Sequence, residues 1–175
     1  MEQFLQKIRE IMEEEFGESS VNNGAIRCMA EDLGRYEGKA IVEAMWVPFV
    51  QGAEYTHPVI QFASTLAQEI EDEVVADIKR SLTDLNVHTM LGQYGYYEPL
   101  RQLYHCYRMP VNLDVPEQSL EEVRYTLQQI RRQLDAYLDY VLVVAEQPNA
   151  MTVEEYIVAT HAENILGEMI GILNV

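Results

Sequence analysis

The sequence predicts an α+β fold: an antiparallel sheet of about five strands with flanking helices, in the order α-β-β-β-α-β-β-α, followed by an extra C-terminal helix. Two observations predict it. Apolar residues recur three and four positions apart in three segments, which is the spacing of a helix with one buried face. Between these segments lie runs in which apolar and polar residues alternate, which is typical of strands.

The N-terminal segment predicts a helix that ends at Gly17, because six apolar residues fall on one stripe: Phe4, Leu5, Ile8, Ile11, Met12 and Phe16. Residues 19–24 are polar and predict a turn. Ala25–Leu33 and residues 39–47 predict two strands that are joined as a hairpin through a glycine-containing turn. The second of these strands is apolar on both faces, so we expect it at the centre of the sheet.

Residues 48–58 predict a loop, and Val59–Ala67 predicts a third strand with its large apolar residues on one face. A helix that runs on into the next segment is the alternative for this stretch. Residues 71–86 predict a helix, because their apolar residues again recur at helical spacing. Two more strands are expected at residues 90–97 and 103–109, on either side of a short turn.

A long helix is expected from Asp114 onward, with apolar residues three and four apart over more than three heptads. Such a seam packs either on the sheet or on a partner helix in a dimer. Its central members are Leu127, Ile130, Leu134, Tyr137 and Val141. Residues 148–175 predict the extra helix, whose start carries a capping box of Thr152 and Glu155. We assign residues 1–147 and the appended residues 148–175 to one domain.

Charge excludes two classes of partner. The chain has 12 Lys plus Arg against 29 Asp plus Glu, a formal charge of −17. Proteins that bind nucleic acid or anionic lipid need a basic face, so we expect neither partner. No apolar run approaches the roughly 20 residues of a membrane span. Cys28 and Cys106 lack metal or redox spacing and predict buried thiols, and with no visible export signal we expect a cytoplasmic protein.

No catalytic, phosphate-binding or metal-binding motif is found, so we expect a protein that is not an enzyme, with no cofactor and no metal. The four histidines are isolated in the sequence. An alternative hypothesis keeps two of them: His88 and His105, with the neighbouring tyrosines, would line the pocket of a small-molecule sensor or an enzyme.

Aromatic residues are concentrated in the predicted strands, where tyrosine suits a surface that keeps one end of each side chain in water. They are either core residues or a protein-binding face. The candidate binding residues are Trp46, Phe62, Tyr94, Tyr96, Tyr104 and Tyr107.

The run VIQFASTLAQEI, the helix that ends in DLN at Asn86, and the pair GQYGYYEP and LYHCYRMPV resemble the YbjN-like family of small bacterial proteins. That family shares its fold with class I type III secretion chaperones. The resemblance covers about residues 1–147. It implies a homodimer without enzymatic activity, which binds an extended segment of a client protein along apolar grooves beside the sheet.

Three hypotheses for function follow. The first is a cytoplasmic protein-binding or chaperone-like module that forms a homodimer and holds a client segment on the apolar and aromatic surface of its sheet. The second is the sensor or enzyme with the tyrosine and histidine pocket. The third is an acidic, inhibitor-like protein that its charge steers to a basic partner.

Overall fold

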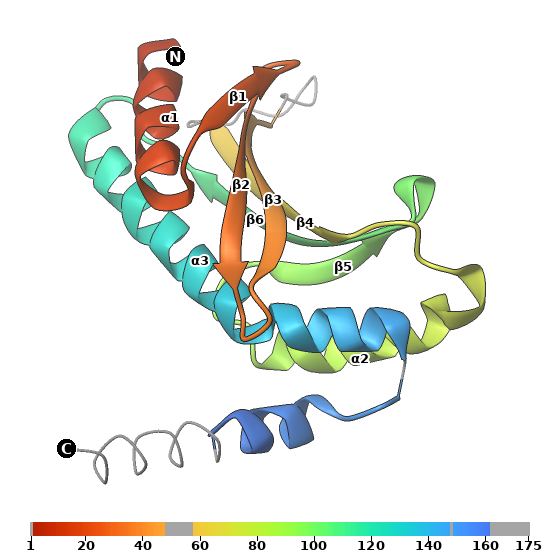
Figure 1. Cartoon of the computed structure of the whole chain (residues 1–175). Coiled ribbons are helices and arrows are strands. Elements are labelled where there is room, and N and C mark those ends of the chain that lie inside the picture. Colours follow the sequence, from red (N-terminus) through yellow and green to blue (C-terminus); the bar gives the residue numbers. More distant parts are fainter. Residues whose placement is uncertain (1, 48–57, 148, 162–175) are drawn as a thin grey trace, which may run out of the picture.

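A computed structural model describes residues 2–47, 58–147 and 149–161 (Figure 1). Six strands form one antiparallel sheet in the order β1-β2-β3-β4-β6-β5. The α+β class and the order of elements are confirmed, with one more strand than predicted. The elements are α1 (Glu2–Phe16), β1 (Ser19–Asn22), β2 (Ala25–Leu33), β3 (Gly38–Trp46), β4 (Val59–Ala67), α2 (Val75–Val87), β5 (Gln93–Tyr97), β6 (Gln102–Pro110) and α3 (Pro116–Glu146), with single turns of 3-10 helix at Asp72–Val74 and Glu98–Leu100.

The additional strand is β1, in the segment predicted as a turn. Asn22 pairs with Ala25, so only Asn23 and Gly24 form the hairpin loop. Both have positive φ, 50° and 78°, and Asn-Gly is the preferred sequence for a two-residue loop of this kind. The polar sequence Ser-Ser-Val-Asn has no apolar alternation, because both faces of this short edge strand are largely exposed.

Val59–Ala67 forms β4, so the strand prediction is confirmed over its helical alternative. It lies between β3 and β6 and is therefore internal to the sheet, as is β3. The loop predicted at residues 48–58 lies, apart from Pro58, outside the described residues.

β5 begins at Gln93, three residues later than predicted, because α3 holds the preceding loop away from the sheet. The Gln133 side chain accepts hydrogen bonds from the N–H groups of Met90 and Leu91, at 3.0 and 3.1 Å, and donates one to the Leu91 carbonyl at 3.0 Å. These bonds use backbone groups that a longer strand would direct to its neighbour.

The helices cover one face of the sheet. Figure 1 shows α3 running diagonally along the left of the strands and then below them, with α1 beside its N-terminal half and α2 near its C-terminal end. The predicted seam of α3 packs into this layer: Leu127, Ile130, Leu134 and Val141 are fully buried, and Tyr137 is half-buried against the core. The seam therefore packs within its own chain and is closed to a partner helix.

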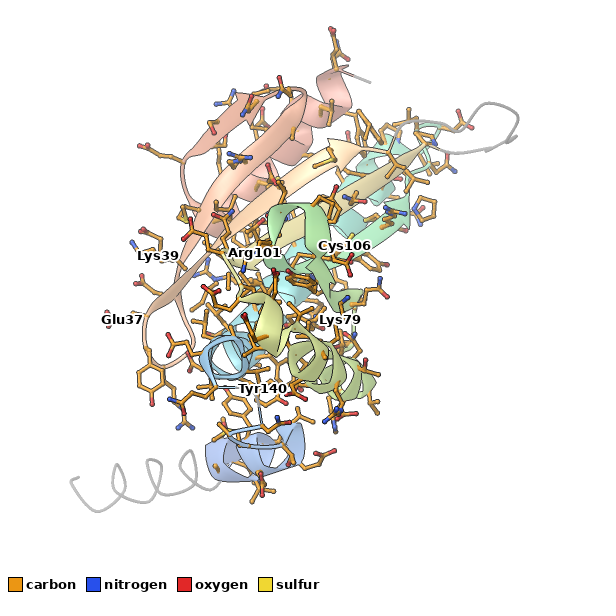
Figure 2. All side chains as sticks on the ribbon, turned by 90° about the vertical axis from the view of Figure 1, so that its right-hand side faces the viewer. Glu37, Lys39, Lys79, Arg101, Cys106 and Tyr140 are labelled. Atoms are coloured by element: carbon orange, nitrogen blue, oxygen red, sulfur yellow. The ribbon has the colours of Figure 1, made fainter. Side chains whose placement is uncertain are left out.

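The C-terminal segment continues the same core. A helix spans 153–161, and its capping box is confirmed by bonds from Thr152 N–H to Glu155 Oε2 (2.8 Å) and from Glu155 N–H to Thr152 Oγ1 (3.2 Å). The Tyr156 ring lies 5.4 Å from that of Tyr140, and its hydroxyl donates to the Ala136 carbonyl. Figure 2 shows Tyr140 between the end of α3 and this helix. The remainder of the predicted extra helix, residues 162–175, lies outside the described residues.

Candidate functional site: a groove on the open face of the sheet

The sheet has a covered face and an open face, and alternation along β4 separates them. Ile60, Phe62 and Ser64 point toward the helices and are buried. Gln61 and Thr65 point the other way and are half-buried, although none of the described helices packs over them. We call this second surface the open face.

Strand register arranges the open face in rows that cross the sheet. Met45, Gln61 and Arg108 form one row. Glu43, Ala63 and Cys106 form the next, followed by Ile41, Thr65 and Tyr104. Side chains directly opposite one another on neighbouring strands lie close enough to contact, so each row is one continuous strip of surface.

A groove of about 720 Å³ crosses these rows. Its floor is low because the outward side chains at the centre of β4, Ala63 and Thr65, are small. Met45, Tyr97 and Tyr104, which also line it, are larger and form its walls. The Tyr104 ring packs directly over Gly95 on β5, which has no side chain to obstruct it. A Cβ at residue 95 would lie 2.6 Å from the Tyr104 hydroxyl oxygen and 2.7 Å from Cζ.

The groove contains one paired and one unpaired charge. Arg27 binds Glu43 Oε1 through Nε at 2.9 Å and through Nη2 at 2.6 Å. Arg108 donates from Nε to Gln61 Oε1 at 2.7 Å, and it forms no ion pair with a carboxylate of the described residues. Because Arg27, which lies outside the lining, already neutralises Glu43, Arg108 is the charge in the groove that no described carboxylate balances, on a protein whose formal charge is −17.

The two cysteines lie on opposite faces of the sheet and are both free thiols. Cys106 lines the groove, and partial burial raises its pKa, opposed by the nearby Arg108. Cys28 is buried on the covered face, and burial raises its pKa to about 11. Both thiols are therefore protonated at neutral pH and are weak nucleophiles.

The structure does not bring the six predicted binding residues together on one face. Tyr104 lies in the groove wall on the open face, and Tyr107 also lines the groove. Phe62 and Tyr94 belong to the core, with 0% and 3% of their surface exposed. Trp46, Tyr96 and Tyr107 are half-buried and pack against that core. Strand register explains this arrangement: the other five residues pair with buried residues of the covered face, whereas Tyr104 pairs with Thr65 on the open face.

Sequence reasoning missed Met45, Ala63, Thr65, Tyr97 and Arg108 as groove residues. The alternation along Val59–Ala67 contains the necessary signal, because its second face holds only small or polar side chains. A central strand with such a face leaves a hollow unless a second layer covers it.

The two histidines of the alternative hypothesis lie in different surroundings. His105 is fully buried on the covered face, where its ring lies 5.1 Å from that of Tyr94 and Nε2 is 2.7 Å from the Leu91 carbonyl. Burial lowers its pKa, and the bond to Leu91 opposes this. His88 follows the end of α2, 3.7 Å from a Glu154 carboxylate oxygen. Neither histidine lines the groove on the open face or the groove between α1 and α3.

Two buried polar atoms, His105 Nδ1 and Ser64 Oγ, have no hydrogen-bond partner among the described residues. The two residues are direct neighbours across β4 and β6. Because the Leu91 carbonyl can only accept, Nε2 carries the ring proton and Nδ1 is an acceptor that faces the core.

A second groove, of about 950 Å³, lies between α1 and the N-terminal half of α3. Its lining includes four glutamates, of which Glu10 pairs with Lys7 and Glu14 pairs with Arg124. Glu117 and Glu121, one helical turn apart on α3, have no such partner among the described residues. This groove is therefore acidic, in contrast to the groove on the open face.

No protein-family model matches the chain, and no curated protein matches it. Among the described residues, no helix is both long and apolar enough to cross a membrane. The same residues contain no cluster of three or more His, Cys, Asp or Glu side chains placed to hold a metal ion.

Proposed function

We propose that this protein is a non-enzymatic binding module that holds an extended segment of a client protein in the groove on the open face. The single observation that supports the proposal most is the uncovered centre of a six-stranded sheet, hollowed where β4 presents Ala63 and Thr65. Internal strands are normally covered on both faces or polar on the outer one. Here the outer face mixes apolar walls with uncharged polar groups.

The chemistry of the lining suits a peptide. Met45, Tyr97 and Tyr104 supply apolar and aromatic contact area, which dominates the affinity of protein interfaces. Gln93 and Gln102, which also line the groove, have side-chain amides that match the hydrogen-bonding groups of a peptide backbone. Charged residues are few, as in the centres of protein interfaces.

A displayed library of random 12-residue linear peptides tests the proposal. Peptides selected on the wild-type protein are expected to lose more than about tenfold in affinity for Ala63→Arg, about 1.4 kcal/mol, because the long side chain fills the hollow. Ala63 points away from the core, so the variant should fold, and thermal denaturation checks this.

Tyr125→Arg is the matched control, since Tyr125 is 60% exposed on α3 and lies outside the groove. We expect its affinity for the same peptides to stay near the wild-type value. Peptides that bind Ala63→Arg as tightly as wild type, or a library without binders, would contradict the proposal.

The proposal extends to cellular setting and assembly. Two free cysteines support a reducing compartment such as the cytoplasm. The resemblance to YbjN-like proteins supports a homodimer, whose contact must lie outside the buried seam of α3. Sedimentation at micromolar concentration tests this, and a monomer would contradict it.

A second candidate function rests on the acidic groove between α1 and α3. It would bind a basic helix, and the charge of the whole chain would steer that partner. Its signature is an affinity that falls steeply with salt and drops in Glu117→Gln/Glu121→Gln, while Ala63→Arg leaves it unchanged.

A further inference from the structure

We infer that the segment held in the open-face groove carries an Asp or Glu side chain, which forms a bidentate ion pair with Arg108. This inference rests on the proposed function and specifies the partner of the same groove. Its starting point is the one charge in the lining that has no carboxylate partner among the described residues.

Arg108 is positioned for such a pair. Its Nε donates to Gln61 Oε1 at 2.7 Å, on the neighbouring strand, and this bond fixes the plane of the guanidinium. Arg108 is also a hydrogen-bonding neighbour of the Cys106 thiol, which lines the same groove, but a thiol is a weak acceptor and does not neutralise the charge. A guanidinium that is held by one neutral side chain and carries five N–H donors is suited to two parallel bonds to a carboxylate.

Desolvation makes the carboxylate necessary. A segment that fills the groove would exclude water from Arg108, and an unpaired buried charge is strongly unfavourable. The other charge in the lining, Glu43, cannot compensate, because Arg27 already binds it through two nitrogens. The compensating charge must therefore come from the bound segment.

The rows of the open face predict how far apart the acidic residue and the apolar residue of the bound segment lie. Arg108 lies in the row with Met45, and the hollow at Ala63 lies in the next row, two residues further along each strand. Two residues of strand span about 6.6 Å. We therefore expect the acidic residue within about two positions of a large apolar residue that enters the hollow.

The charge of the whole protein opposes the approach of an acidic segment, and this gives a second readout. Charges separated by more than about 8 Å are largely screened at 0.15 M ionic strength, whereas a desolvated pair is screened much less. The association rate of the acidic peptide should therefore rise with salt. A basic partner of the acidic groove should show the opposite dependence.

The random 12-residue library tests the inference when it is selected separately on wild type and on Arg108→Glu. We expect Asp and Glu to be enriched next to an apolar residue on wild type, and Lys or Arg to take that position on Arg108→Glu. For a synthetic wild-type binder, Glu→Gln in the peptide should weaken binding about tenfold to wild type and have little effect on Arg108→Gln. Arg132→Gln, an exposed α3 position outside the groove, should bind both peptides as wild type does.

Three outcomes overturn the inference in distinguishable ways. Binders that Ala63→Arg blocks but that show no acidic preference leave the proposed function intact and refute the ion pair. A second outcome is a peptide that loses affinity when its C-terminus is amidated but keeps it when its Glu is replaced by Gln. That result would show that Arg108 binds the C-terminal carboxylate of the peptide instead of a side chain. Peptides that bind Ala63→Arg unchanged refute the proposed function itself.

Discussion

Gly92 precedes β5 at a point where the backbone passes close to β6. Its φ is +70°, and a Cβ at this position would collide with the backbone carbonyl oxygen of Cys106 and lie 2.8 Å from His105 Nε2. The glycine lets the loop approach close enough for the Leu91 carbonyl to reach the buried imidazole. A side chain at residue 92 would disturb this contact as well as the backbone.

We predict that Gly92→Ala destabilises the protein more than Gly24→Ala. Both positions have positive φ, at which a non-glycine residue costs about 1–2 kcal/mol, but nothing lies within 4 Å of a Cβ at Gly24. At Gly92 the Cys106 carbonyl must also shift. Urea denaturation of the two variants measures the difference in their free energies of unfolding. Equal decreases in the two variants would show that the close approach of Gly92 to Cys106 does not contribute to stability.

His105 should make folding stability depend on pH. The unfolded pKa is about 6.5, and burial lowers the folded pKa below it. Below pH 6.5 the unfolded chain therefore binds a proton at His105 that the folded protein excludes. The stabilising contribution of the neutral imidazole is fully present above pH 6.5, and the free energy of unfolding decreases as the pH falls below it. The decline is expected to begin near pH 6.5 and to continue as the pH falls toward the lowered pKa of the folded protein.

Denaturation of wild type, His105→Gln and His88→Gln at pH 7.5 and 5.5 checks this. We expect the wild type and His88→Gln to lose stability on acidification and His105→Gln to lose much less. The carboxylates of Glu10, Glu13 and Glu98, whose pKa values are lowered from 4.5, titrate below this range. A loss of the same size in His105→Gln would assign the pH dependence to other groups.

At the scale of elements, a side chain of α2 hydrogen-bonds to the outer edge of the edge strand β5. Asn86, in the last turn of α2, accepts a hydrogen bond from the Tyr94 N–H at 2.7 Å and donates one to the Tyr94 carbonyl at 2.9 Å. An unpaired strand edge is a template for aggregation, and the two hydrogen bonds of the Asn86 amide occupy the outward-facing backbone groups of Tyr94, the second residue of this strand.

We predict that Asn86→Ala lowers the free energy of unfolding by about 1–3 kcal/mol, because two hydrogen bonds at about 0.5–1.5 kcal/mol each are lost. Hydrogen exchange at the Tyr94 amide should accelerate in the same variant. Thr83→Ala, which removes an exposed bond to the Lys79 carbonyl on the same helix, is the control and should have a small effect. Unchanged exchange at Tyr94 would mean that β5 does not depend on Asn86.

The elements differ in how well the sequence predicted them. α3 was predicted because the spacing of its apolar residues persists through 31 residues, and α1 for the same reason over 15. β1 was missed because its stability comes from the Asn23-Gly24 turn and pairing with β2, neither of which needs an apolar pattern. The start of β5 was misplaced because Gln133, about 40 residues away, decides where the loop ends.

At the scale of the whole molecule, the groove could not be predicted from any one strand. Alternation tells which residues of a strand share a face, but the position of the helices decides which face is covered. The neighbours of Ala63 on β3 and β6 depend on register, which is set by contacts distant in the sequence. Alternation within one strand did carry usable information, since on β5 it separates Tyr97, which lines the groove, from Tyr94 and Tyr96, which pack on the core.

Charge also acts on the whole molecule, since a formal charge of −17 is distributed over a compact chain of 175 residues. No cation follows Arg132 in the sequence, and Glu146 ends α3 without a basic residue in its last turn. Self-repulsion of this kind destabilises the compact state relative to the expanded one, and dissolved ions screen it. We therefore predict that raising NaCl from 10 to about 300 mM stabilises the protein, on the order of 1 kcal/mol or roughly 2–4 °C in melting temperature.

Glu146→Lys separates this effect from the general action of salt. The substitution lowers the net negative charge and places a cation at a helix C-terminus, where it contributes about 0.3–1 kcal/mol at low ionic strength. The variant should be more stable than wild type at 10 mM NaCl and gain less from added salt. Glu2→Lys makes the same change in charge at the N-terminus of α1, where the helix dipole favours an acid, and should gain less stability. Parallel salt curves for all three proteins would show that screening of self-repulsion does not limit the stability of this fold.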